Sequence, residues 1–386
     1  MSRDALHIVL KIVVNICRFL LAATFLFSGF VKANDPLGMV YKLEDYFSAW
    51  GITGVPELFT LLMAMGIALF EFVLGVYLFF GMRRKWVSRI TLVFMAMMTL
   101  LTVYIAIANP VSDCGCFGDA IILTNVQTLL KNIVLLGAAI VVFRWYRLQP
   151  HLISTSVYWI VSTLFTLGLL AYMMYCIYAL PVIDFRPYKV GTDLRTMVEV
   201  PEDQRPQFEV TIIYEKDGKT LELSIDDDDP DSTWTYVETR RKQISGASQQ
   251  IINDFYIEYG DEEVTGDILA YEGSTLLLCA PDLQTADESI MDKINDLYDY
   301  AQANDIMYYC LTASDEATCS RWADYTGAEY LCLTADDRTL KTMVRSNPGL
   351  ILLHDGRIIK KWSHWNFPAQ EEIQGLISPL ASKAAH

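Results

Sequence analysis

Five long apolar runs in the first half of the chain constrain its fold more than any other feature. They lie near residues 8–31, 57–81, 87–108, 121–143 and 155–180. Each has about the 20 mostly apolar residues that a helix needs to span a bilayer. A helix is also one of only two structures that satisfy all backbone polar groups in lipid. The runs therefore predict five membrane-spanning helices.

The charged residues are concentrated in the other half. The chain has 386 residues, of which 53% are hydrophobic, yet its formal net charge is −16. The acidic residues crowd the chain after Asp193, whereas the apolar runs end by Leu180. We therefore expect a membrane part followed by an acidic, water-soluble part. Nucleic acid is excluded as a partner, because its phosphates would repel a surface of this charge.

Basic residues near the ends of the spans predict the orientation. Arg83, Arg84 and Lys85 lie between the second and third runs, and Arg144 and Arg147 lie between the fourth and fifth. Short cytoplasmic loops are enriched in lysine and arginine, so these loops and the N-terminus are expected in the cytoplasm. Five spans then place the C-terminal part on the outer face of the membrane, which is the periplasm if the membrane is the inner membrane of a Gram-negative bacterium.

The patterns divide the chain into four segments. We expect a four-helix transmembrane bundle over residues 1–150, a fifth transmembrane helix and exit segment over 151–186, a small β-rich connector over 187–249 and an α/β domain over 250–386. The first apolar run lacks the small-residue cleavage site of a secretory signal. It is therefore interpreted as a retained helix.

Three ionisable residues interrupt the apolar runs. Counted from the outer ends of their runs, Arg18, Glu71 and Lys131 fall within roughly 6 Å of one depth at about 1.5 Å per residue. Ions are costly in hydrocarbon and usually have a partner there, so we expect Glu71 to pair with Arg18, Lys131 or both. This polar centre could only fix the register of the helices, or it could bind a ligand or handle protons, for instance at a quinone head group.

The predicted outer loop before the fourth run contains Cys114-Gly115-Cys116. Gly115 lets the backbone adopt the tight turn that a small disulfide ring requires. Such a ring should be strained, and strained, exposed disulfides are typically the exchanging ones. Cys114 and Cys116 are therefore candidate catalytic residues, with an inert disulfide or inert thiols as the alternative. A metal is a weaker option, since two thiolates fill half of a tetrahedral site, and no metal site is predicted elsewhere.

Two acidic residues flank this pair of thiols. Asp113 and Asp119 should raise the pKa of both thiols by like-charge repulsion. That would slow attack by these thiols, unless Lys32 or a partner supplies positive charge.

These residues together resemble the DoxX/MauE-type bacterial membrane proteins. The resemblance covers roughly residues 8–145 and rests on Arg18-Phe-Leu-Leu, Ser28-Gly-Phe-Val-Lys32, Asp35-Pro36, Glu71 and Ser112-Asp-Cys-Gly-Cys-Phe-Gly118. It implies a four-helix bundle that is distantly similar to disulfide-generating quinone reductases, with members in respiratory or thiol-redox complexes. In the methylamine-utilisation members, the bundle works with a separate thioredoxin-like protein.

After the fifth span, the first clear pattern is a hairpin. Residues 208–225 alternate around Lys216-Asp-Gly-Lys219, which is a strand-turn-strand signal. The acidic run from Asp226 to Asp231 that follows is interpreted as a solvated turn. It lacks the spaced ligands, glycine and terminal glutamate of a calcium loop.

Strand and helix alternate from about residue 250. After two short β elements between 253 and 270, strands are expected at 274–280, 306–312, 329–334, 350–354 and 357–362, and helices at 286–303, 315–326, 336–346 and 368–379. Such alternation predicts an α/β domain with a parallel-rich sheet.

This order of elements, with Pro348 just before the fourth strand, resembles the thioredoxin-like fold of periplasmic reductases and peroxiredoxins over about 250–382. Pro348 stands where that family has its cis-proline. Active members carry Cys-x-x-Cys at the start of the first helix, where the helix dipole lowers a thiol pKa. Here those positions fall near Leu283 and Ala286. The resemblance thus implies a thioredoxin-like binding module without thioredoxin chemistry.

The remaining cysteines of this domain are expected to be structural. Cys279, Cys310 and Cys332 lie in apolar strand segments, where cysteines are typically buried and inert. A cross-strand disulfide between Cys310 and Cys332 stays open as an alternative. Cys319 lies on a predicted helix and is expected to be free.

Two functions from different classes follow from these patterns. The first is support of periplasmic thiol-disulfide exchange or electron transfer through the Cys-Gly-Cys loop, with the thioredoxin-like domain docking an envelope client. The second is a non-catalytic membrane anchor or assembly subunit that recruits an envelope complex. The cofactor is left open, with a quinone as the candidate, and no partner identity or oligomeric state follows from the sequence.

Overall fold

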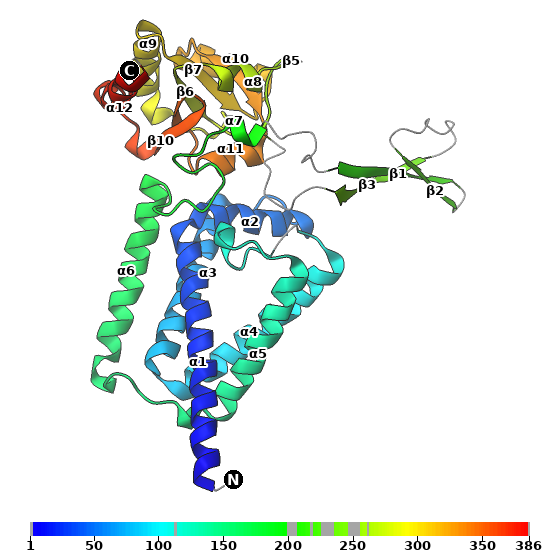
Figure 1. The fold of residues 1–386 in the computed structure, drawn as a ribbon, viewed down its shortest axis with the longest axis vertical. Helices are drawn as coiled ribbons and strands as arrows, with labels where there is room; N and C mark the ends of the chain where they lie inside the picture. The colour runs from blue at the N-terminus through cyan, green and yellow to red at the C-terminus, as the bar shows by residue number, and fades with distance from the viewer. Residues whose placement is uncertain are drawn as a thin grey trace.

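The computed structural model describes residues 3–111, 114–198, 207–216, 219–224, 235–245, 255–260 and 262–384. Within them, a helical membrane part is followed by an α/β domain (Figure 1). Asp113 and the acidic run at 226–231 lie outside the described residues, and so do the predictions made for them.

Among the described residues, five helices are long and apolar enough to cross a membrane, as predicted. They are α1 (Arg3–Asn34), α3 (Glu57–Phe80), α4 (Arg84–Ala108), α5 (Asn125–Arg144) and α6 (Tyr158–Ala179). The helix faces that point away from the bundle are apolar and exposed; Leu100, for example, is 71% exposed and Ile107 is 81% exposed. Faces of this kind need lipid around them rather than water.

The helices α1 and α3 cross at unusually short range. A Cβ atom on Gly29 would lie 2.5 Å from the backbone nitrogen of Phe72, and one on Gly75 would lie 2.8 Å from that of Leu26. Small residues allow such close approach in membranes, where packing rather than hydrophobic burial drives helix association. The crossing places the last turns of α1 beside Glu71.

The segment between the first two spans contains a further helix, α2 (Pro36–Ala49). Asp35 caps it by accepting a hydrogen bond from the backbone nitrogen of Gly38 at 2.8 Å, and Pro36 occupies its first turn. The helix lies across the end of the bundle that faces the α/β domain (Figure 1). We call that end the domain side and the opposite end the far side.

Residues 180–194 connect α6 to the α/β domain. Leu180, Tyr188 and Leu194 are buried in one of the two cores of that domain. The amide of Asn34 at the end of α1 donates a hydrogen bond to the carbonyl oxygen of Ile183 at 2.7 Å. The exit segment is therefore packed against both parts of the chain.

A three-stranded antiparallel sheet follows, in the order β2-β1-β3. Its strands are β1 (Gln207–Lys216), β2 (Lys219–Ser224) and β3 (Thr235–Ser245). Because β1 and β2 pair up to Lys216 opposite Lys219, the predicted hairpin is confirmed.

Residues 255–384, here called the C-terminal domain, form a seven-stranded mixed sheet in the order β10-β9-β6-β7-β8-β4-β5. The strands are β4 (Ile257–Tyr259), β5 (Glu262–Glu263), β6 (Ser274–Cys279), β7 (Met307–Thr312), β8 (Leu331–Ala335), β9 (Gly349–His354) and β10 (Arg357–Ser363). The strands β6, β7 and β8 run parallel, whereas β9 runs antiparallel to β6 and β10 antiparallel to β9.

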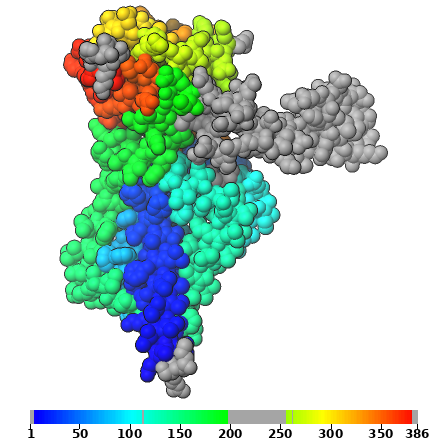
Figure 2. All heavy atoms as spheres, viewed as in Figure 1, coloured from blue at the N-terminus to red at the C-terminus, as the bar shows by residue number. Residues whose placement is uncertain are grey.

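Helices cover both faces of this sheet. They are α8 (Thr265–Ala270), α9 (Met291–Ala303), α10 (Glu316–Thr326), α11 (Asp337–Met343) and α12 (Gln370–Ala384). Strand β6 is buried along its whole length, as expected for a central strand with both faces covered. The predicted α/β domain is thus confirmed, and it sits on the domain side of the bundle (Figure 2).

Candidate functional site: a dithiol loop between the bundle and the C-terminal domain

The Cys-Gly-Cys loop joins α4 to α5 on the domain side. Gly115 and Gly118 have φ values of +66° and +51°, in the left-handed region that favours glycine. Gly115 also faces α2, where an added Cβ would lie 2.9 Å from Cγ of Lys42. This tight turn brings the sulfur atoms of Cys114 and Cys116, both free thiols, to 2.9 Å from each other.

A buried polar cluster holds the loop against α1. The ammonium group of Lys32 donates hydrogen bonds to the carbonyl oxygen of Cys116 at 2.8 Å and to Oγ of Ser28 at 2.7 Å. It also forms an ion pair with Oε2 of Glu71 at 2.7 Å, and both side chains are only 5% exposed. The polar centre of the bundle is therefore directly bonded to the dithiol loop.

The partner of Glu71 differs from the prediction, which named Arg18 or Lys131. Arg18 donates hydrogen bonds to the carbonyl oxygens of Pro150 at 2.8 Å and of Phe79 at 3.4 Å, on the far side. It precedes Lys32 by 14 residues, or about 21 Å of helix. The depth estimate was wrong because it assumed that the outer ends of all spans lie at one level.

Lys131 lies closer to the site, but it also does not pair with Glu71. Its ammonium nitrogen lies 4.1 Å from the centroid of the Phe117 ring, an ordinary cation–π distance. Phe117 follows Cys116 directly and packs edge-on against Phe27. Lys131 therefore adds positive charge to the dithiol loop from α5.

The surroundings make the two thiols unequal. The hydrogen bond from Cys114 lowers the pKa of Cys116 to about 6, against burial, and the positive charges of Lys131 and Lys32 act in the same direction. The same hydrogen bond and burial raise the pKa of Cys114. Cys116 is therefore the thiolate of the pair near neutral pH, and Cys114 is its donor.

This result corrects the prediction for Cys116, whose pKa is lowered, whereas the pKa of Cys114 is raised by its hydrogen bond with Cys116 and by burial and not by the flanking acids. Asp119 instead pairs with Arg345 of the C-terminal domain, with 3.4 Å between Oδ2 and Nη2. Asp113 lies outside the described residues. The positive charge near Cys116 comes from Lys32, as the sequence suggested, and from Lys131.

The cysteine motif positions of a thioredoxin are filled by core residues in the C-terminal domain. Leu283 and Ala286 are 3% and 8% exposed. Pro348 follows a cis peptide bond, and its neighbour Asn347 donates a hydrogen bond to the carbonyl oxygen of Asp282 at 2.7 Å. The loop of Asn347 and Pro348 thus contacts the loop that starts at Asp282, as expected for a thioredoxin-like fold. The motif positions of that loop carry Leu283 and Ala286 instead of cysteines.

Of the four thiols in the domain, Cys279 and Cys310 are buried, whereas Cys319 and Cys332 are half-buried. Burial raises the pKa of Cys279 to about 12. Cys310 and Cys332 occupy paired positions on β7 and β8, and both are free, as is Cys319. Cys310 and Cys332 are therefore neighbours across two strands, as a cross-strand disulfide would require, but both are free thiols.

Two cavities bear on ligand binding. A cavity of about 50 Å³ lies between the dithiol loop and the exit segment, lined among others by Lys32, Asp119 and Arg186. It has room for a few waters and no more. A groove of about 590 Å³ between α3, α4 and α6 is apolar, but its lining contains neither the dithiol nor Glu71. A quinone in that groove would not touch the dithiol.

Fold and site together define the class: a multi-pass membrane protein with a dithiol loop beneath a thioredoxin-like domain of the same chain. The first four spans of its membrane part are similar to the MauE family. Residues 10–144 match the family model described as methylamine utilisation protein MauE, which confirms that part of the resemblance. Residues 208–246 match a domain of unknown function, DUF8463. A search of curated proteins finds no match.

Solved structures resemble part of the chain. One is a proposed protein disulfide isomerase from Bacteroides thetaiotaomicron, at 20% identity, with a TM-score of 0.26 and coverage of 33% of this chain and 84% of that one. Another is a cysteine-to-serine mutant of peroxiredoxin Q from Xanthomonas campestris, at 10% identity, with a TM-score of 0.24 and coverage of 34% and 90%. Because both TM-scores are low, the thioredoxin-like assignment rests on the strand order and helix placement.

Three residues of this site were not predicted in their roles. Ser28 was noted only within the family resemblance, and Lys32 was noted there and as a possible positive charge near the thiols but not as the partner of Glu71. The spacing of four residues between them places both on one helix face. Arg345 gave no signal beyond its position near Pro348. Its contacts with the bundle depend on the docking of the two parts.

Proposed function

We propose that this chain supports thiol-disulfide exchange in the bacterial cell envelope through Cys114 and Cys116. The observation that carries the proposal is the pair itself: two free thiols 2.9 Å apart, beside the ammonium group of Lys32. Reactive cysteines typically lie next to positive charge and are partly accessible. Cys116 meets both conditions, because it is half-buried and faces Lys32 and Lys131.

The exchange balances as follows for the reduced form. The Cys116 thiolate attacks one sulfur of a partner's disulfide, and the partner's other sulfur leaves as a thiolate. The Cys114 sulfur then attacks Cys116, so that the Cys114–Cys116 bond forms while the mixed disulfide breaks. Two electrons pass to the partner, one of whose sulfurs takes up the proton that Cys114 loses while the other leaves as a thiolate and is protonated from water according to its pKa. In reverse, the same steps oxidise a partner dithiol.

The location proposed for this chemistry follows from the basic loops on the far side. Arg83, Arg84 and Arg147 lie there, and the positive-inside rule assigns them to the cytoplasm. The domain side, with the dithiol loop and the C-terminal domain, is then periplasmic, where disulfides persist. A client would dock on a part of the C-terminal domain that does not face the bundle.

A second function, a non-catalytic anchor or assembly subunit, is favoured by the buried Leu283 and Ala286. A domain without cysteines at the two motif positions can still bind a partner. In this case the dithiol would be inert.

A redox titration separates the two functions. Membranes are equilibrated across glutathione potentials, and the Cys114–Cys116 pair is scored by mass-shift alkylation, with Cys114→Ser as the control. A reversible transition above roughly −300 mV, where structural bridges typically do not titrate, supports exchange. If the pair remains reduced under oxidising conditions, or resists every physiological reductant, exchange is ruled out and the anchor function remains.

A further inference from the structure

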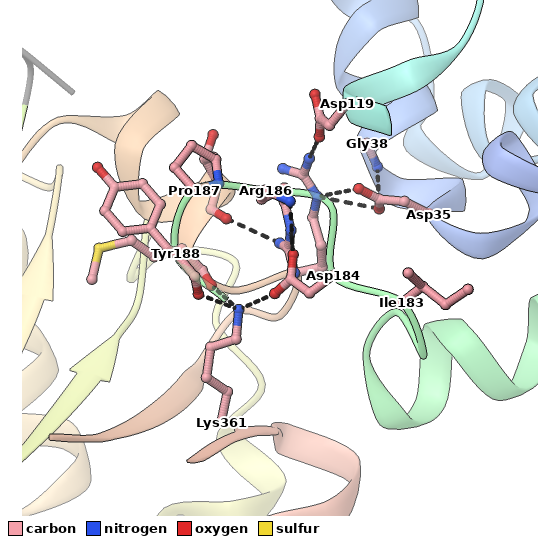
Figure 3. Close-up of polar contacts among 12 residues, drawn as sticks. Asp35, Gly38, Asp119, Ile183, Asp184, Arg186, Pro187, Tyr188 and Lys361 are labelled. Carbon is pink, nitrogen blue, oxygen red and sulfur yellow. Dashed lines mark hydrogen bonds and ion pairs between the residues drawn. The ribbon is translucent and has the colours of Figure 1, made fainter. Parts of the chain in front are cut away.

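One buried arginine of the C-terminal domain contacts both halves of the dithiol site. The Arg345 side chain is 7% exposed. Its Nε lies 3.0 and 3.2 Å from the two carboxylate oxygens of Asp35, and its Nη2 lies 3.4 Å from Oδ2 of Asp119. Figure 3 shows both carboxylates, which come from the bundle, at this junction.

The two carboxylates belong to the segments that must meet for the site to form. Asp35 follows the last residue of α1, three residues after Lys32. Asp119 lies in the short helical turn Gly118–Ala120, three residues after Cys116. One guanidinium group thus ties the end of α1 that carries Lys32 to the loop that carries Cys116.

The local structure on the bundle is shaped to receive this side chain. A Cβ atom on Gly38 would lie 2.4 Å from Oδ2 of Asp35 and 2.9 Å from Nη2 of Arg345, so only glycine leaves room there. The guanidinium carbon lies 5.2 Å from the ring centroid of Tyr41, within cation–π range. Both contacts come from the first turns of α2.

Arg345 is equally fixed within its own domain. It donates a hydrogen bond to the carbonyl oxygen of Lys341 in α11, and it lies between that helix and β9. Nearby, Lys361 of β10 pairs with Asp184 of the exit segment, which also pairs with Arg186 (Figure 3). The C-terminal domain therefore holds Arg345 rigidly above the loop.

We propose that Arg345 is a positioning residue for the dithiol: it holds the Cys-Gly-Cys loop against Lys32, so that the thioredoxin-like domain assembles the reactive thiol of the membrane part. This inference rests on the proposed function for its purpose. Its geometry rests only on the contacts of Arg345 with Asp35 and Asp119. The domain without its own cysteine motif thus has a role at a thiol site on another part of the chain.

The charges around Cys116 explain what the positioning would change. The titratable and charged groups that face its thiol are Cys114 in the loop, Lys131 on α5, Lys32 on α1 and Glu71 on α3. Cys114 moves with the loop, whereas Lys131, Lys32 and Glu71 belong to helices, so a loop that moves away leaves behind a net positive charge, and the loss of that charge raises the pKa of Cys116. The hydrogen bond of Lys32 with the carbonyl oxygen of Cys116 would be lost with that movement.

The test measures the pH dependence of Cys116 alkylation in the reduced, full-length protein in lipid nanodiscs. Arg345→Gln should move the midpoint of the profile upward by about one pH unit, which is a tenfold lower rate below the midpoint. Arg345→Lys keeps the charge but loses the fork that grips two carboxylates, so it should give a smaller upward shift. The matched control is Arg338→Gln, because Arg338 bridges to Asp45 of α2 but is 82% exposed.

Asp119→Asn separates positioning from simple electrostatics. Removing a negative charge would by itself lower the midpoint, whereas releasing the loop raises it. An upward shift therefore supports the positioning role, and a downward shift or none overturns it. This variant also keeps the contact of Arg345 with Asp35, so it remains informative if Arg345→Gln fails to fold.

The result does not depend on whether the dithiol exchanges with a partner. Alkylation of the reduced protein requires only a thiolate, so an inert pair in the glutathione titration would end the proposed function and leave the positioning test valid. Conversely, unchanged profiles in folded Arg345→Gln and Asp119→Asn would overturn the positioning role alone.

Discussion

At the scale of single residues, the main feature is an ion pair that joins the bundle to the dithiol loop. Lys32 and Glu71 are both buried; Oγ of Ser28 donates a hydrogen bond to Oε2 of Glu71, and Lys32 also donates to Ser28 and to the carbonyl oxygen of Cys116. A buried pair is not by itself evidence of stability, but the loss of one partner leaves an uncompensated charge. The cluster should therefore tolerate paired changes better than single ones.

Glu71→Gln should destabilise the detergent-purified protein by about 3–5 kcal/mol, because it leaves the Lys32 ammonium group buried without its counter-ion. The measurement is thermal unfolding followed by a native-state fluorescence signal. Glu57→Gln is the control, since Glu57 starts the same helix but is exposed. Equal unfolding temperatures for the two variants would remove the ion pair from the list of stabilising contacts.

Cys116 and Cys279 should differ sharply in their response to pH. The alkylation rate of Cys116 should rise with pH through a midpoint near its pKa of about 6, because only the thiolate reacts. Cys279, whose pKa burial raises to about 12, should stay unreactive near neutral pH in the folded protein. Mass spectrometry of the alkylated peptides measures both, and an unreactive Cys116 at pH 7 would contradict the proposed nucleophile.

At the scale of elements, close packing of two helices decides the position of the site. The α1–α3 crossing relies on Gly29 and Gly75, whose missing side chains let the backbones approach. Ser28 precedes Gly29 and Glu71 precedes Phe72. Because these polar residues are direct neighbours of the contact, helix separation would pull the polar cluster apart.

Gly29→Ala should weaken both the fold and the Lys32–Glu71 pair, since the new Cβ would lie 2.5 Å from a backbone nitrogen of α3. Gly137→Ala on α5 is the matched control, because its Cβ would meet no atom within 4 Å. We expect a clearly lower unfolding temperature for the first variant and little change for the second. If the two behaved alike, the glycine contact would not be what positions α1 on α3.

At the scale of the whole molecule, the C-terminal domain sits on one end of the bundle, and the N-terminal end of α1 lies at the opposite end (Figure 2). Contacts between the parts include Arg345 with Asp35, Arg338 with Asp45, and the hydroxyl of Ser363 with the carbonyl oxygen of Tyr178. The domain is therefore docked on the bundle rather than linked to it by the chain alone.

Protease added to intact spheroplasts should remove the C-terminal domain and leave the far-side loops uncut. The reason is the placement of Arg83, Arg84 and Arg147 on the far side, which the positive-inside rule assigns to the cytoplasm. Immunoblots against tags at the two ends measure the outcome, with lysed spheroplasts as the control for cleavability. A protected C-terminal domain would reverse the proposed orientation.

Much of the fold followed from local sequence patterns. The apolar runs identified all five spans, and the alternation of strands and helices after residue 250 gave the α/β domain, because length and periodicity of apolar residues reflect local burial. The helix α2 was missed, since it is short and lies among charged residues. The loop of Cys114 and Cys116 was found because its glycine and thiols are adjacent in the chain.

The rest was decided by contacts between distant residues. Glu71 pairs with Lys32 and not with Arg18 because α1 and α3 are offset along their axes, and the offset depends on packing at Gly29. Arg345 reaches Asp35 across 310 positions of the chain. The sequence by itself determined that this is a membrane bundle with a dithiol loop and a thioredoxin-like domain without the Cys-x-x-Cys motif, because those features are local. Only the tertiary structure decided which charges face the thiol, because electrostatic partners are set by distance in space.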